Sequence, residues 1–177
     1  MKIPFNVDAN TARLIGRENV SKLDGAILEL VKNAYDADAT TCILYYEKTT
    51  NTFYLIDNGS GMTSETIRNN WMTIGYSSKK DNYKLNSGRI QTGAKGIGRF
   101  ALDRIADNCK MLSKTKTESI LWSVNWSDFN SGTKITDVGA DFETTNIDFC
   151  NYTSTILNNN LKSLIKDKKM SVVTFLK

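Results

Sequence analysis

An acid and an amide lie four positions apart near residue 30 of this 177-residue chain. On a helix, Glu29 and Asn33 project from the same face, because residues four apart are neighbours on the helix surface. The carboxylate of Glu29 can activate a water molecule as a general base, and the amide oxygen of Asn33 can ligate Mg²⁺. A solvated helix edge without chemistry is the alternative for this pair taken alone.

A second candidate group is the carboxylate of Asp57, which ends a β-rich segment at the turn Asp57-Asn58-Gly59-Ser60-Gly61-Met62. The two glycines allow the backbone to turn sharply beside this carboxylate. A carboxylate in that place can accept a hydrogen bond from an amino group such as N6 of adenine. An ordinary Asp-Asn-Gly turn, which is common between strands, is the alternative.

A third candidate is the glycine-rich stretch Gly93-x-x-Gly96-x-Gly98, which precedes a predicted helix. Free backbone N–H groups and the helix dipole at such a start can hold phosphate oxygens. The stretch lacks the Gly-Lys-Ser/Thr ending of a Walker loop, and its spacing does not match the dinucleotide-binding fingerprint. A helix start without a ligand is the alternative.

The elements that position these groups follow from hydrophobic periodicity and turn signals. Predicted helices run from about Ser21 to Asp36, from a cap at Thr63, from Arg99 to Asn108 and from Thr153 to Lys166. Predicted strands are the hairpins Cys42–Glu47 with Thr52–Asp57 and Cys109–Thr115 with Ser119–Trp126, and the single strands Lys134–Val138 and Ser171–Leu176. Residues 3–7 are either a short strand or an arm, and 75–98 form a long loop. This order predicts an α+β fold with a mixed or mostly antiparallel sheet and helices on one face.

The composition is that of one globular domain, with 40% hydrophobic and 24% charged residues and a net charge of +4. The chain has no histidine, which excludes histidine-based catalysis, metal ligation and autophosphorylation within it. Its three cysteines lack metal-ligand spacing. No apolar run is long enough to span a membrane and no signal peptide is recognisable, so a cytoplasmic location is expected. The mild charge favours a solvated surface over a nucleic-acid interface.

In this order, the three motifs resemble those of the GHKL ATPases, which include gyrase B, MutL-type proteins, heat-shock chaperones, microrchidia-type ATPases and histidine-kinase catalytic domains. The resemblance is strongest over residues 20–106, and the segment 71–79 is similar to the start of the ATP lid in chaperone-like and microrchidia-like members. It implies a Bergerat fold, a two-layer α/β sandwich with a mixed, mostly antiparallel sheet, helices on one face and an ATP lid over 75–98.

The resemblance also implies roles for individual positions. Glu29 would be the catalytic general base, Asn33 would ligate Mg²⁺, and Asp57 would bind adenine N6. The other implied nucleotide-binding positions are Ala37, Gly59, Gly61, Met62, Ser78, Lys79, Gly93, Lys95, Gly96, Ile97, Gly98 and Ser171. A late contact to adenine is open between Thr133, which follows a glycine but comes early, and Ser171, which has the expected place without the glycine.

The expected function is Mg²⁺-dependent binding and slow hydrolysis of ATP, driving a conformational or dimerisation switch for a downstream effector. A nucleotide-binding module that never hydrolyses and a histidine-kinase-type catalytic domain are the alternatives. Residues 1–177 are expected to be one ATP-binding domain, the N-terminal module of a longer protein. The expected partners are an adenine nucleotide and, through the N-terminal arm, a second copy in an ATP-dependent homodimer. Neither a membrane nor a nucleic acid is indicated as a partner of this domain.

Overall fold

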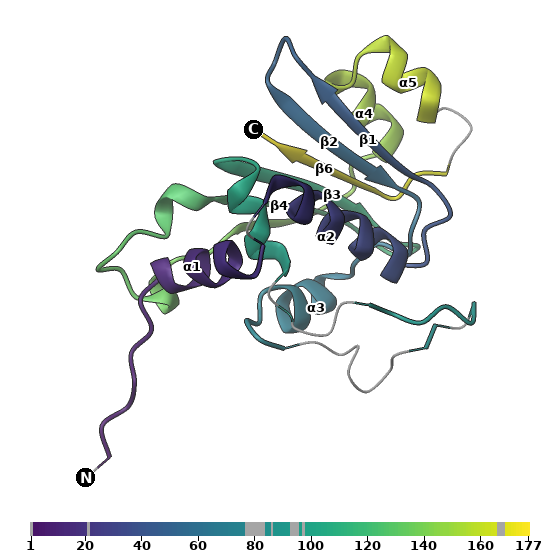
Figure 1. The fold of residues 1–177 in the computed structure, drawn as a ribbon. Coiled ribbons are helices and arrows are strands. Elements are labelled where there is room, and N and C mark those ends of the chain that lie inside the picture. Colours follow the sequence, from purple (N-terminus) through teal and green to yellow (C-terminus); the bar gives the residue numbers. More distant parts are fainter. Residues whose placement is uncertain are drawn as a thin grey trace.

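The architecture was derived from a computed structural model, which describes residues 2–20, 22–76, 84–85, 87–92, 96, 98–165 and 169–177 (Figure 1). Within these residues, six strands form one sheet in the order β1-β2-β6-β3-β4-β5, and every neighbouring pair is antiparallel. The strands are β1 (Cys42–Glu47), β2 (Thr52–Asp57), β3 (Asn108–Lys114), β4 (Ser119–Asn125), β5 (Asp141–Thr145) and β6 (Val172–Leu176). The α+β class predicted from the sequence is confirmed.

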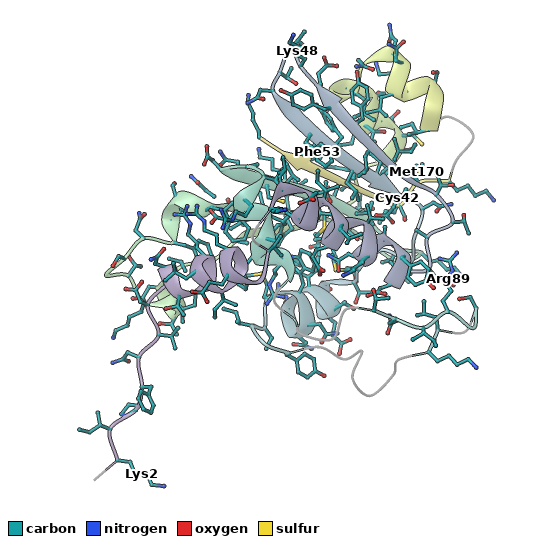
Figure 2. The ribbon with its side chains drawn as sticks, in the orientation of Figure 1. Lys2, Cys42, Lys48, Phe53, Arg89 and Met170 are labelled. Atoms are coloured by element: carbon teal, nitrogen blue, oxygen red, sulfur yellow. The ribbon has the colours of Figure 1, made fainter. Side chains whose placement is uncertain are left out.

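Helices precede the first strand and lie between later strands along the chain. They are α1 (Asn10–Asn19), α2 (Leu23–Asp36), α3 (Ser64–Thr66), which continues into the π-helical turn η1 (Ile67–Trp71), the 3₁₀ helix η3 (Gly98–Arg104), the short 3₁₀ helices η4 (Trp126–Asp128) and η5 (Ile135–Asp137), α4 (Phe149–Ile156) and α5 (Asn159–Ile165). Before α1, residues 2–7 extend away from the body of the domain as an exposed arm, with Lys2 at its far end (Figure 2).

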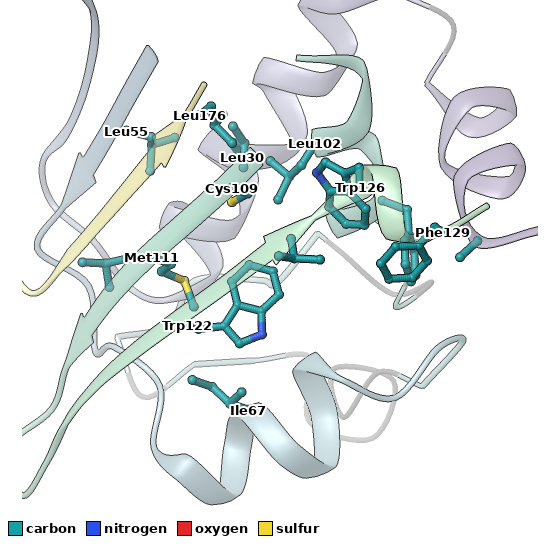
Figure 3. Packing of buried hydrophobic residues seen from close by; sticks show 14 of the residues in the cluster. Leu30, Leu55, Ile67, Leu102, Cys109, Met111, Trp122, Trp126, Phe129 and Leu176 are labelled. Atoms are coloured by element: carbon teal, nitrogen blue, oxygen red, sulfur yellow. The ribbon is translucent and has the colours of Figure 1, made fainter. Parts of the chain in front are cut away.

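The sheet is covered by helices on both faces, because apolar residues alternate along its central strands. Leu55 and Met111 face the larger core, which they share with Leu30 of α2 and Leu102 of η3 (Figure 3). Ile56 and its neighbours on the opposite face form a second core. This second core comprises Tyr54, Ile56, Leu112, Phe149, Leu157, Leu161 and Val173. Helices were expected on one face of the sheet, but α4 and α5 also cover the other face.

Several predicted elements are confirmed by the structure. Both hairpins, the long helix that becomes α2 and the last strand are present within one or two residues of their predicted bounds. Thr63 caps α3 as expected, since its side-chain oxygen accepts a hydrogen bond from the N–H of Thr66 at 3.1 Å.

Other predicted elements are wrong. The segment predicted as a strand at 134–138 is the helix η5, and the sheet instead gains β5 at 141–145. The helix predicted over 153–166 is two helices, because the side chain of Asn158 accepts a hydrogen bond from the N–H of Leu161 and begins α5 anew. The helix predicted over 99–108 is the shorter 3₁₀ helix η3, and β3 already begins at Asn108.

Helix α1, which was not predicted, packs so closely on η3 that Gly16 leaves no room for a side chain. A Cβ atom at Gly16 would overlap the backbone of Phe100. Gly16→Ala is therefore expected to lower the free energy of unfolding by about 1–3 kcal/mol through overpacking, although alanine favours an isolated helix by about 1 kcal/mol over glycine.

Denaturant unfolding of the two variants Gly16→Ala and Gly139→Ala would check this expectation. Gly139 is the matched control, because a Cβ atom there would meet nothing within 4 Å. A Gly16→Ala variant as stable as the control would contradict the close contact between α1 and η3.

Candidate functional site

A cavity of about 570 Å³ lies between α2 and the face of the sheet that carries the larger core. Leu55, Thr174 and Met111 sit side by side on β2, β6 and β3 and line the cavity. Glu29, Asn33 and the other α2 residues form a second wall. A mostly apolar cavity of this volume with a few polar groups is typical of a small-molecule site.

Asp57 lies at the end of β2 in the cavity wall and is only 4% exposed. Burial raises the pKa of its carboxyl group to about 6, although the hydrogen bond from the N–H of Gly59 to its Oδ1 at 2.8 Å acts in the opposite direction. A carboxylate that is costly to bury favours a ligand that donates a hydrogen bond to it.

The turn after Asp57 is fitted closely against the end of α2. This helix ends in a Schellman motif, in which Ala39 N–H donates to the carbonyl of Ala34 and Asp38 adopts a positive φ of 63°. The N–H of Ser60 then donates to the carbonyl of Ala37 at 2.8 Å. A Cβ atom on Gly59 would stand 2.8 Å from that of Ala37, so a larger residue there would separate the turn from the helix.

Gly61 is required in the same turn for two reasons. Its φ of +69° is unfavourable for other residues, and a Cβ atom would overlap the backbone of Lys114. The next residue, Met62, is held by a hydrogen bond from its N–H to the hydroxyl of Ser113 at 2.7 Å. Both Gly61 and Met62 line the cavity near Asp57.

Glu29 and Asn33 line the cavity from α2, which shows that they share the inward face of this helix. An ion pair joins Glu29 Oε1 to Lys32 Nζ at 2.9 Å. The other oxygen of Glu29, Oε2, lies so near the start of η3 that a Cβ atom on Gly98 would stand 3.0 Å from it. Glu29 therefore lies beside the end of the glycine-rich stretch. Ala37, near Asp57, follows Glu29 by eight residues, which is a rise of about 12 Å along the helix.

The described ends of the predicted lid meet at the cavity. Gly75 N–H donates to the carbonyl of Gly96 at 3.4 Å, and Gly96, with a φ of +67°, fits directly against the backbone of Tyr76. Tyr76 and Gly96 both line the cavity. The residues between them that the structure describes are 84–85 and 87–92.

The later part of this segment is anchored on the end of α2. The N–H of Thr92 donates to Asp36 Oδ1 at 2.8 Å, and the amide of Gln91 donates to the carbonyl of Asp36 at 2.9 Å. Arg89 donates to the carbonyl of Ala39 at 2.7 Å and lies beside this end of α2 (Figure 2).

Most predicted site positions that the structure describes converge on this cavity. Those in its wall are Glu29, Asn33, Ala37, Asp57, Gly61, Met62, Gly96 and Gly98. Gly59 and Ser171 lie directly behind the wall, where the hydroxyl of Ser171 donates to the carbonyl of Gly59. Five further predicted positions lie outside the described residues. They are Ser78, Lys79, Gly93, Lys95 and Ile97.

The two candidates for a late adenine contact have different neighbours in the structure. Ser171 N–H donates to the carbonyl of Asp57 at 2.9 Å, so Ser171 adjoins the turn. Thr133 instead accepts a hydrogen bond from the N–H of Ala9 at the start of α1 and is not part of the cavity wall. Because Ser171 adjoins the turn after Asp57, it is the better candidate of the two.

Sequence reasoning missed three charged residues of the cavity wall, Lys32, Asp36 and Arg99. Asp36 follows Asn33 by three positions and Glu29 by seven, a spacing that places it on the same helix face. Arg99 directly follows the last glycine of the glycine-rich stretch. Only the fold shows that both side chains are almost fully buried, at 4% and 7% exposure.

Comparison with known proteins identifies the family. A family model described as "Histidine kinase-, DNA gyrase B-, and HSP90-like ATPase" matches residues 20–155, and the chain belongs to this family. Adenine-nucleotide binding and an ATPase type of activity are properties of the family as a whole. Among the described residues, no helix is both long enough and apolar enough to cross a membrane.

A curated protein from Herpetosiphon aurantiacus, named "Putative type II restriction enzyme HgiDII", is 36% identical to this chain over 86 residues. The aligned part is 49% of this chain but only 14% of the relative.

Proposed function

We propose that this domain binds ATP together with Mg²⁺ and slowly hydrolyses the bond between its β- and γ-phosphates. The observation that carries the proposal is the placement of two kinds of polar group at separate places along one cavity. Asp57, with the turn that follows it, lies near the end of α2, and Glu29 lies beside Gly98 about 12 Å away along α2. An extended nucleotide fits this arrangement with adenine at Asp57 and its phosphates at the start of η3.

Glu29 is proposed to act as the general base, accepting a proton from the water that attacks the terminal phosphate. Its ion pair with Lys32 holds Oε1, while Oε2 lies on the side of Gly98, where the attacking water would be placed. Gly98 adjoins Glu29, so phosphates near the backbone N–H groups at the start of η3 would be within reach of the base.

Asn33 is the residue proposed to hold Mg²⁺. Magnesium in nucleotide sites takes one or two protein oxygens and completes its shell with phosphates and water. Asn33 fits this type of site, because its side-chain amide can offer one oxygen ligand from the cavity wall. The ion, when bound, would neutralise phosphate charge.

Calorimetry of the purified chain with a non-hydrolysable ATP analogue, with and without Mg²⁺, tests the binding proposal, and phosphate release tests hydrolysis. We expect binding that Mg²⁺ strengthens and a slow, Mg²⁺-dependent release of phosphate. Binding without phosphate release at any chain concentration would favour the alternative of a non-hydrolysing module. A phosphate transfer to a protein histidine would favour the kinase alternative.

We further propose that the chain is one ATP-binding module of a longer protein and that nucleotide binding drives its dimerisation. The arm at residues 2–7 carries the exposed side chains Ile3 and Phe5 and the half-exposed Val7. The relative's name makes DNA restriction a first effector process to examine in the longer protein. The cytoplasmic location stays a prediction.

Light scattering with and without the ATP analogue tests dimerisation. A nucleotide-dependent rise in mass that disappears on deletion of residues 2–7 is expected, and an unchanged mass over a wide range of concentrations would contradict the switch.

A further inference from the structure

The charged side chains in the cavity wall are matched by partners, with one exception among the described residues. Glu29 pairs with Lys32, Asp36 accepts hydrogen bonds from Thr92, and Asp57 accepts one from Gly59. Arg99 has neither a carboxylate nor any hydrogen-bond acceptor within the described part of the chain, and its Nη2 atom is buried without a partner. Among the described residues of the cavity wall, Arg99 is therefore a cation without a paired carboxylate.

The surroundings of Arg99 are aromatic rather than acidic. Its guanidinium lies 5.0 Å from the ring centre of Phe100 and 5.9 Å from that of Trp71. Burial lowers the pKa of Arg99 to about 10, so the side chain is still charged at neutral pH. Burying a charge among rings without an acceptor is costly, and such a group is expected to have a partner that binds from outside.

The position of Arg99 indicates the chemistry of that partner. Arg99 follows Gly98, which adjoins the carboxylate of Glu29, so Arg99 belongs to the part of the cavity away from Asp57. A buried guanidinium in the cavity wall without a protein acceptor at Nη2 favours an anion with several oxygens. The side chain already lines the cavity, and its four torsions allow Nη2 to turn toward a ligand there.

We propose that Arg99 is a binding residue for the phosphate chain, which it holds by charge-assisted hydrogen bonds to the β- or γ-phosphate oxygens. This proposal rests on the proposed nucleotide site and adds to it a cation supplied within the domain. It also predicts an affinity order of ATP over ADP over adenosine to which this side chain contributes.

Arg99→Met tests the proposal, with Arg104→Met as the matched control on the exposed side of the same 3₁₀ helix. Calorimetry with the non-hydrolysable ATP analogue should show a roughly tenfold to hundredfold loss of affinity for Arg99→Met, the cost of a charge-assisted hydrogen bond. Adenosine should bind to both variants and to the wild type within about twofold, because it has no phosphates. Arg99→Lys, which keeps the charge, should recover part of the lost affinity.

Two results would overturn the role of Arg99. An equal loss of affinity for adenosine and for the ATP analogue would show that Arg99 only supports the fold, and an unchanged affinity for the analogue would show that it does not contact phosphate. Thermal unfolding with inorganic tripolyphosphate separates this proposal from the nucleotide site itself. Stabilisation of the wild type but not of Arg99→Met by tripolyphosphate, without any binding of adenosine, would support the anion site and contradict the nucleotide proposal.

Discussion

Replacing Glu29 by alanine is expected to lower the rate of ATP turnover by about 10²–10⁴, the usual contribution of a general base. Affinity for the ATP analogue should change little, since the adenine end of the proposed site lies near Asp57 and the phosphates contact the start of η3. Glu29 is half-buried and takes part in a single ion pair with Lys32 among the described residues, so its loss should not unfold the domain. Phosphate formation in a single turnover, with the protein in excess over ATP, measures the chemical step directly.

Glu65→Ala is the control for this experiment, because Glu65 is an exposed carboxylate in α3 outside the cavity wall. It should leave turnover unchanged. Turnover of Glu29→Ala within threefold of the control would exclude Glu29 as the base. If Glu29→Ala lost affinity for the ATP analogue as well as turnover, Glu29 would contribute to binding of ATP rather than to the chemical step alone.

The parts of the fold that the sequence predicted are those specified by local patterns. Strict alternation in Ile120, Trp122 and Val124 matches the inward face of β4, and all three are buried. In α2, apolar residues at helical spacing place Leu30 in the core, and with it the inward face that carries Glu29. A pattern of this kind needs no knowledge of distant partners, which is why both elements were predicted.

The elements that were missed depend on partners far away in the chain. Strand β5 carries a single large apolar residue, Phe142, and forms because Trp122 and the rest of β4 pair with it. Helix α1 and its N-cap residue bury small residues, Ala12 and Ala9, whose contribution is visible only when they meet the core. The sequence of 134–138 has strand-like apolar residues, but Ile135 and Val138 reach the core from a 3₁₀ turn.

The residues of the candidate site likewise divide into those that local sequence patterns predict and those that depend on distant contacts. Motif positions such as Asp57 and Gly61 were predicted because glycine spacing reports on local backbone geometry. Arg99 and Asp36 were not predicted, because arginine and aspartate are usually exposed and their burial follows from the packing of η3 and α2.

Replacing Asp57 by asparagine is expected to weaken the binding of adenine nucleotides at least tenfold at neutral pH. A carboxylate accepts a hydrogen bond from the adenine amino group, and loss of a hydrogen bond in a buried site costs about 1–3 kcal/mol. Asparagine is nearly isosteric, so the turn and its bond from Gly59 to the side-chain oxygen can persist. The fold should even gain stability near pH 7, because the raised pKa of Asp57 shows that burying its ionised form is unfavourable.

The same carboxyl group predicts a pH dependence of binding. Because its pKa in the free protein is about 6, protonation below that pH turns a carboxylate oxygen into an O–H donor that opposes the adenine amino group, and affinity should fall as the pH drops from 7 to 5. Phosphate groups titrate in the same range, with a pKa of about 6, so the effect of Asp57 is the difference between the wild type and Asp57→Asn. Calorimetry across this range should show a steep fall for the wild type and a shallow one for the variant. Parallel curves for the two proteins, or equal affinity at pH 7, would mean that adenine does not meet Asp57.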